Sequence, residues 1–139
     1  MADNKESIGV IGSGLIGRAW AMVFARAGHP VRIYDNDQTA ARNAVTLIAQ
    51  GLADLHKAQL LSDTPANISA RITIHETIQD TLKGVSYVQE NTLENERVKR
   101  EVFSALEAAA APDTILASST SMIPTSSFAG HLNSRARCI

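Results

Sequence analysis

The segment VIGSGLIGRAW, residues 10–20, places a Gly-x-Gly-x-x-Gly pattern, residues 12–17, between an apolar run and a helical pattern. The apolar run at 8–11 predicts a strand. The segment 15–27, rich in Ala, Leu, Ile, Val and Phe, predicts a helix that a glycine and a proline end. Glycine clusters are common at turns, so the surroundings of this pattern decide its meaning.

A second strand, predicted at residues 31–34, ends in Asp35, which follows Gly17 by 18 positions. Strand, glycine turn, helix, strand and acid in this order form a dinucleotide-binding fingerprint, in which the acid follows the glycines by about 20 residues. Gly12 permits the tight turn, Gly14 lets backbone N–H groups and the positive end of the helix dipole face a pyrophosphate, and Gly17 allows close packing on the strand. The alternative is a structural turn followed by an incidental surface aspartate.

Asp35 also predicts which dinucleotide binds. Its carboxylate is able to accept hydrogen bonds from both hydroxyls of the adenosine ribose, and its negative charge repels a 2′-phosphate. The next residue, Asn36, supplies no positive charge to offset that repulsion. We therefore expect NAD(H) rather than NADP(H). Flavin-binding proteins share the fingerprint, so the glycine turn predicts a dinucleotide and leaves the chemistry open.

The rest of the chain alternates helical patterns with short apolar strands. Helices are predicted at 40–55, 77–83, 94–111 and 124–129, a capped turn at Thr64-Pro65, and strands at 71–74, 85–89, 114–117 and from 135 onward. The helix at 94–111 is expected to turn inward Val98, Val102, Leu106 and Ala109. Such alternation predicts an α/β fold of Rossmann type, with a doubly wound, mainly parallel sheet and helices on both faces.

Composition limits the class of protein. A chain of 139 residues that is 45% apolar predicts one domain, residues 1–139. Thirteen Lys and Arg against 14 Asp and Glu leave no basic surface for nucleic acid. No apolar stretch approaches the ~20 residues of a membrane span, and the polar N-terminus is unlike a signal peptide. A single cysteine, Cys138, excludes an internal disulfide or a thiolate metal cluster. We expect a cytoplasmic protein without a metal.

Two polar segments directly follow predicted strands: VQENTLENERVK at 88–99 and ASSTSMIP at 117–124. Ligands of open parallel sheets lie outside the carboxyl ends of the strands, so these segments are where function is expected. Plainer interpretations stay open for each. Glu94 suits a helix start, where the dipole favours a carboxylate, and Lys99 suits a solvated helix face. The hydroxyls at 118–121 suit a capping turn before the next helix.

Three segments in series resemble the NAD-binding domain of the L-3-hydroxyacyl-CoA dehydrogenases. They are GVIGSGLIGRAWAMVFARAGHPVRIYD at 9–35, YVQENTLENERVKREVF at 87–103 and ILASSTSMIP at 115–124. The resemblance covers nearly the whole chain and is greatest for the branch that includes lambda-crystallin, or L-gulonate 3-dehydrogenase, and the carnitine dehydrogenases. Three motifs in the correct order are far more specific than the glycine pattern alone.

The resemblance implies roles for individual residues. It places Leu15 and Ile16 beside Gly12, Gly14 and Gly17 along the pyrophosphate, and Asp35 at the adenosine ribose. The residues that it places along the cofactor cleft toward the nicotinamide half are Asn91, Glu94 and Lys99. It also implies that Ser121 contacts both the nicotinamide and the substrate and takes part in catalysis.

The reaction implied is oxidation of the 3-hydroxyl of an L-3-hydroxyacyl-CoA or a free L-3-hydroxy acid to a ketone, by hydride transfer to NAD, as in fatty acid metabolism. Ser119 stands where the acyl-CoA branch typically has asparagine, which favours a free hydroxy acid. The family's basic histidine follows a sixth strand, whereas His131 precedes it. We therefore expect an N-terminal domain, inactive alone, of a homodimeric enzyme whose helical domain follows Ile139.

Two other classes of function stay open on the sequence. One is a stand-alone dinucleotide-binding or sensing module without chemistry of its own. The other is a β-hydroxyacid or ketopantoate-type reductase, which also begins with a glycine turn. Those reductases usually prefer NADP and carry Asn, Arg or Thr at the position of Asp35.

Overall fold

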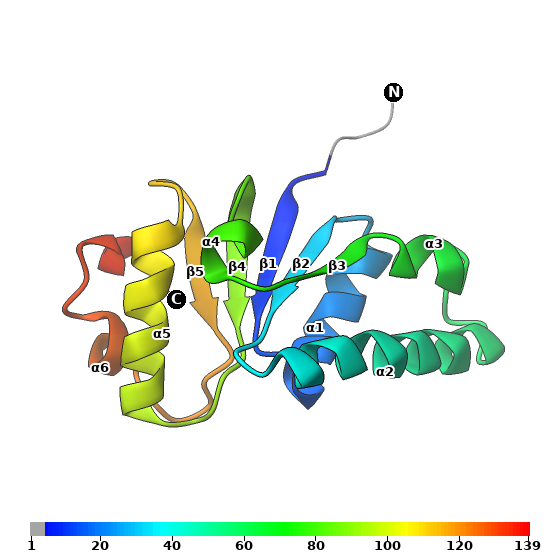
Figure 1. Ribbon diagram of the computed structural model, residues 1–139, viewed down its shortest axis with the longest axis horizontal. Helices are drawn as coiled ribbons and strands as arrows, with labels where there is room; N and C mark the ends of the chain where they lie inside the picture. Colours follow the sequence, from blue (N-terminus) through cyan, green and yellow to red (C-terminus); the bar gives the residue numbers. More distant parts are fainter. Residues whose placement is uncertain (1–4) are drawn as a thin grey trace.

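A computed structural model describes residues 5–139 as one parallel sheet with helices on both faces (Figure 1). The strands are β1 (Ser7–Ile11), β2 (Val31–Tyr34), β3 (Ile72–His75), β4 (Val85–Glu90) and β5 (Ile115–Ser118). Their order across the sheet is β3-β2-β1-β4-β5, and every pairing is parallel. The α/β fold with a doubly wound sheet that the sequence predicts is therefore confirmed.

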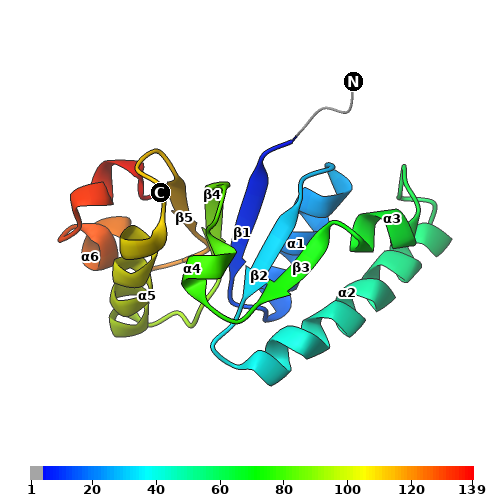
Figure 2. The ribbon, with the colours of Figure 1, turned by 45° about the horizontal axis from the view of Figure 1, so that its top comes forward.

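The helices form two layers (Figure 2). On one face lie α1 (Leu15–Arg26), α2 (Gln38–Lys57) and α3 (Pro65–Ser69), and on the other α4 (Ile78–Thr81), α5 (Glu96–Ala109) and α6 (Thr125–Ala129). A 3-10 helix, Asn133–Arg137, follows α6. Even α2, which has 20 residues, is amphipathic, and no helix within residues 5–139 has the length and apolar character to cross a membrane.

The central strand β1 supplies both halves of the core. Val10 packs in the cluster with α1 and α2, and Ile11 packs in the cluster with α5 and α6, because successive side chains of a strand point to opposite faces. Both are essentially inaccessible to water, and burying side chains of this size contributes about 1.5–3 kcal/mol each. Phe103 of α5 and Phe128 of α6 meet with ring centroids 4.7 Å apart, which packs α6 against α5.

The strand order reverses direction between β1 and β4. From β1 the chain runs outward through β2 to β3, then returns to pair β4 against the other side of β1. The segments that leave these two strands consequently diverge at the same edge of the sheet. Asn91 N donates to Ile11 O at 2.7 Å, and Gly12 N donates to Tyr34 O at 2.8 Å. The glycine turn therefore lies between the ends of β2 and β4, where open α/β sheets bind ligands.

The helix predicted from residue 94 begins at Glu96. Asn95 is its N-cap, with the side-chain oxygen accepting from Val98 N at 3.1 Å. The inward face agrees with the prediction at Leu106, which is buried, and differs in that the other buried residues of α5 are Lys99 and Phe103. Val98 and Val102 are only half-buried because they face a cleft described below.

The strand predicted from Arg135 onward is wrong over residues 135–137, which belong to the 3-10 helix. The Glu107 carboxylate accepts from Ser134 N at 2.6 Å, and this bond stabilises a tight turn before any strand pairing begins. Pairing beside β5 starts only at the next residues: Cys138 bridges Leu116, and Ile139 N donates to Leu116 O at 3.0 Å.

Replacing Gly17 by alanine is expected to destabilise the fold. A Cβ at residue 17 falls 1.9 Å from the carbonyl oxygen of Gly12, so α1 must move away from β1. Overpacking of this kind typically costs about 1–3 kcal/mol, more than the ~1 kcal/mol that alanine gains over glycine inside a helix. Urea unfolding checks this, with Gly14→Ala as the control, since a Cβ there meets nothing within 4 Å. A Gly17→Ala chain as stable as the unmodified chain contradicts the prediction.

Candidate functional site

A cleft of about 590 Å³ opens at the carboxyl ends of β1, β2 and β4. Among the residues predicted from the sequence, those that line it are Gly12, Gly14, Asp35 and Asn91. Its apolar wall comes from the ends of β1 and β2, from α4 and from α5, through Ile11, Tyr34, Ile78, Val98, Val102 and Ala105. This wall was not predicted, because the apolar pattern of α5 assigns Val98 and Val102 to the core.

The glycine turn leaves the start of α1 open. Gly12 has a φ of +88°, and a Cβ there falls 2.8 Å from Asn91 O, so the turn requires glycine. Gly14 is the N-cap of α1 and offers no side-chain acceptor, whereas Asp37 caps α2 and Asn95 caps α5. No acidic residue occupies the first turn of α1. Its free N–H groups therefore concentrate positive potential beside the cleft.

Two hydrogen-bonding partners fix Asp35 at the edge of this turn. Ser13 donates to Oδ2 from both its backbone N and its Oγ, each at 2.7 Å, and Asp37 N donates to Oδ1 at 2.9 Å. Ser13 itself is buried, at 2% exposure. A carboxylate has about four acceptor sites, so Asp35 keeps spare acceptor capacity beside these three hydrogen bonds.

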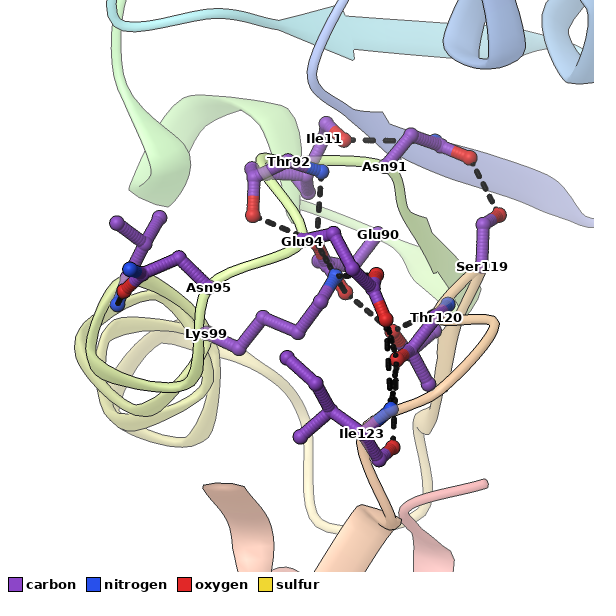
Figure 3. A network of polar contacts seen from close by, with 12 residues as sticks. Ile11, Glu90, Asn91, Thr92, Glu94, Asn95, Lys99, Ser119, Thr120 and Ile123 are labelled. Atoms are coloured by element: carbon purple, nitrogen blue, oxygen red, sulfur yellow. Dashed lines mark hydrogen bonds and ion pairs between the residues drawn. The ribbon is translucent and has the colours of Figure 1, made fainter. Parts of the chain in front are cut away.

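The Asn91 carboxamide joins the ends of three strands. Its Nδ2 donates to Gln89 O at 2.8 Å and to Ile11 O at 3.4 Å, and its Oδ1 accepts from Ser119 Oγ at 2.6 Å (Figure 3). Ser119 in turn accepts from Gln89 Nε2 at 2.8 Å. The amide thus couples the ends of β1 and β4 to the segment after β5.

Glu94 precedes the N-cap of α5 and turns its carboxylate toward the segment after β5. Oε1 accepts from Thr120 Oγ1 at 2.7 Å and from the backbone N of Ser121, Met122 and Ile123 at 3.2, 3.0 and 3.3 Å (Figure 3). We call residues 120–123 the serine loop. These bonds, with the Thr120 hydroxyl the strongest, hold the pKa of Glu94 at about 2, below its ordinary 4.5.

Several predicted residues stand apart from the cleft lining. Leu15 and Ile16 are exposed on the first turn of α1, next to the open N–H groups. Gly17 is buried against the carbonyl of Gly12. Ser121 is exposed on the serine loop, where Glu94 holds its backbone. The hydroxyls after β5 do not cap α6, whose N-cap is Pro124, so that plainer interpretation is wrong.

Lys99 lies below the surface in an ion pair. Its Nζ is 3.0 and 3.1 Å from the two carboxylate oxygens of Glu90 and 3.8 Å from Glu94 Oε2. Lys99 is 1% exposed and Glu90 0%, so the solvated-face interpretation of Lys99 is wrong. Removing one member of such a buried pair typically costs about 3–5 kcal/mol. Sequence reasoning missed Glu90, although a carboxylate that closes an apolar strand, nine positions before a lysine, was a visible signal.

The low pKa of Glu94 predicts a pH-dependent stability. Because the folded-state pKa is about 2 and the ordinary value is 4.5, the ionised carboxylate stabilises the fold above pH 4.5 and loses that effect as the pH falls toward 2. Glu94→Gln should therefore lower the free energy of unfolding near neutral pH, with the difference from the unmodified chain narrowing below pH 4.5. Urea unfolding across this range measures it, with the exposed Glu96→Gln as control. A difference that stays constant with pH contradicts the prediction.

A family model described as 3-hydroxyacyl-CoA dehydrogenase, NAD binding domain, matches residues 7–139. The human lambda-crystallin homolog is 32% identical over 131 residues, covering 87% of this chain and 39% of that protein. L-carnitine dehydrogenase/betainyl-CoA thioesterase of Rhizobium meliloti is 38% identical over 112 residues, covering 80% of this chain and 22% of that protein.

The solved structure of 3-hydroxybutyryl-CoA dehydrogenase from Escherichia coli K12 superposes with a TM-score of 0.89 at 29% identity, covering 97% of this chain and 29% of that one. This chain therefore spans well under half the length of these relatives. The match of the family model extends over nearly every described residue, from β1 to the residues beside β5. The chain belongs to the family of 3-hydroxyacyl-CoA dehydrogenase NAD-binding domains.

Proposed function

We propose that the cleft binds NAD(H), and that the chain is the cofactor-binding part of an enzyme that oxidises the 3-hydroxyl of an L-3-hydroxyacyl-CoA or a free L-3-hydroxy acid to a ketone. The observation that carries the proposal is Asp35, held by Ser13 beside an uncapped helix start at the point where the strand order reverses. Membership of an NAD-binding family supports the choice of cofactor and disfavours the reductases that begin with a similar turn.

The residues present fit a dinucleotide. Gly14 leaves open space above the first turn of α1, which suits a pyrophosphate bound by backbone N–H groups, with Leu15 and Ile16 alongside. Asp35 offers acceptors to the adenosine ribose. The half-buried side chains of Ile78 and Val102 offer an apolar surface to the adenine. The volume of about 590 Å³ lies within the ordinary range of cofactor pockets.

Asn91, Glu94 and the serine loop are proposed to face the nicotinamide half. The cofactor supplies a hydride acceptor, while the protein supplies position and electrostatics. The backbone of Ser121 is held by Glu94 and its side chain is exposed, so its hydroxyl is available to a ligand. Among residues 5–139 no histidine lines the cleft, and the general base is proposed to come from elsewhere in the whole enzyme, which we also propose to be a homodimer.

The two substrate classes correspond to named relatives. One solved relative is a 3-hydroxybutyryl-CoA dehydrogenase, and one curated relative is an L-carnitine dehydrogenase/betainyl-CoA thioesterase. Ser119 favours the free hydroxy acid, and here its hydroxyl is engaged by Gln89 and Asn91.

Asp35→Ala is expected to weaken NADH binding by about 1–3 kcal/mol, the scale of a charge-assisted hydrogen bond. Isothermal titration calorimetry of the 139-residue chain measures this, and NADPH should bind the unmodified chain more weakly than NADH. Asp37→Ser is the matched control, because it removes a nearby charge and keeps a capping oxygen for α2. Unchanged NADH affinity in Asp35→Ala, or tighter binding of NADPH, contradicts the proposal.

Gly14→Val is expected to abolish NADH binding while the chain stays folded. A Cβ at Gly14 meets no protein atom within 4 Å, so the branched side chain enters the space proposed for the pyrophosphate instead of the core. Circular dichroism tests the fold and calorimetry tests binding. Retained NADH affinity means that the glycine turn has a structural role only.

A further inference from the structure

Glu90 joins three segments of the proposed site from the interior of the protein. It is the last residue of β4 and is inaccessible to water. Its Oε1 accepts from Thr92 N and Thr92 Oγ1, each at 2.6 Å, and its Oε2 accepts from Ser118 Oγ at 2.5 Å. Lys99 Nζ approaches both oxygens. The carboxylate therefore binds the segment after β4, the end of β5 and helix α5 at one point.

Lys99 connects this carboxylate to a second one. Its ammonium lies 3.0 Å from Glu90 Oε1 and 3.8 Å from Glu94 Oε2, so Glu90 holds the closer contact (Figure 3). Glu94 consequently keeps Oε1 for the serine loop, from which that oxygen accepts four hydrogen bonds. If the negative charge at position 90 is lost, Lys99 has its remaining ion-pair partner in Glu94.

A second route runs from Glu90 to the same loop. Ser118 Oγ donates to Glu90 Oε2 and accepts from Thr120 N at 3.1 Å. Thr120 is also the residue whose hydroxyl binds Glu94 at 2.7 Å. Both routes end on the serine loop, and neither includes Asp35 or the glycine turn.

We propose that Glu90 is a positioning residue for the nicotinamide side of the site. By holding Lys99 and Ser118, it fixes Glu94 and the serine loop in the arrangement that presents Ser121. Glu90 is buried and does not line the cleft, so it acts through these residues without touching the cofactor. The inference rests on the proposed function. It adds Glu90 to the residues that support binding and assigns the two halves of the cofactor to different residues: Asp35 contacts the adenosine half, and Glu90 positions the loop at the nicotinamide half.

The test compares NADH with ADP, which carries the adenosine and the diphosphate but lacks the nicotinamide riboside. In the unmodified chain NADH should bind more tightly than ADP. Glu90→Gln keeps the size of the side chain but removes its charge, and should lower the NADH affinity at least about threefold, the scale of one net hydrogen bond. The ADP affinity should stay within about twofold, since its proposed contacts lie outside the network.

Ser118→Ala keeps the test decisive if Glu90→Gln fails to fold. It removes one hydrogen bond of Glu90 and leaves the ion pair with Lys99 intact, so it should fold and show the same selective loss for NADH. Glu96→Gln, an exposed Glu-to-Gln change nearby on α5, should alter neither affinity.

Three outcomes overturn the inference. If NADH and ADP affinities fall together in Ser118→Ala, the network has only a structural role. If neither changes in a folded Glu90→Gln or Ser118→Ala chain, the network does not act on the site. If the unmodified chain binds ADP as tightly as NADH, the serine loop contributes nothing to binding. Failure of the proposed function is distinct, because the unmodified chain then binds neither ligand.

Discussion

The close approach of α1 to the end of β1 is the constraint on which the site depends. The carbonyl of Gly12 occupies the space where a side chain of residue 17 would begin. Because α1 packs this closely, it begins only a few residues after β1 ends. Its first N–H groups therefore lie at the edge of the sheet where the chain leaves β1 and β4 in different directions. Because Gly12 N is also bonded to the end of β2, the same turn brings Asp35 within reach of Ser13. The contact between residue 17 and the Gly12 carbonyl thus fixes the start of α1, the conformation of the glycine turn and the position of Asp35 beside Ser13.

Features encoded by neighbouring residues were predictable from the sequence. The strand that precedes Asp35, the glycine turn and the proline at the start of α3 each depend on backbone preferences within a few positions. The placement of the Glu94 carboxylate and the 3-10 helix at 133–137 were not, because distant partners decide them. Glu94 is drawn to a loop 26 to 29 residues away, and Glu107 holds a turn 27 residues away.

The same distinction separates the predicted part of the site from the rest. The glycines and Asp35 follow a known spacing, whereas Ser13 fills a position of that pattern that any residue can take. Lys99 shows the physical difficulty most clearly. A pattern of apolar residues identifies the buried face of a helix, and a lysine joins that face only when another element supplies a carboxylate. Here β4 supplies Glu90, which lies outside the periodic pattern of α5.

The bonds of Ser119 have an evolutionary consequence. Because the Gln89 amide donates to its hydroxyl, the hydroxyl proton must point to Asn91 Oδ1, and Tyr87 continues the same direction by donating to Gln89 Oε1. Each group in this chain of hydrogen bonds can therefore take only one role, donor or acceptor, toward each neighbour. A change at position 119 that removes the hydroxyl or reverses its role takes away the hydrogen bonds that Ser119 makes with Gln89 Nε2 and Asn91 Oδ1. Natural variation at positions 89, 91 and 119 is therefore expected to be correlated, and these positions are inherited as a set.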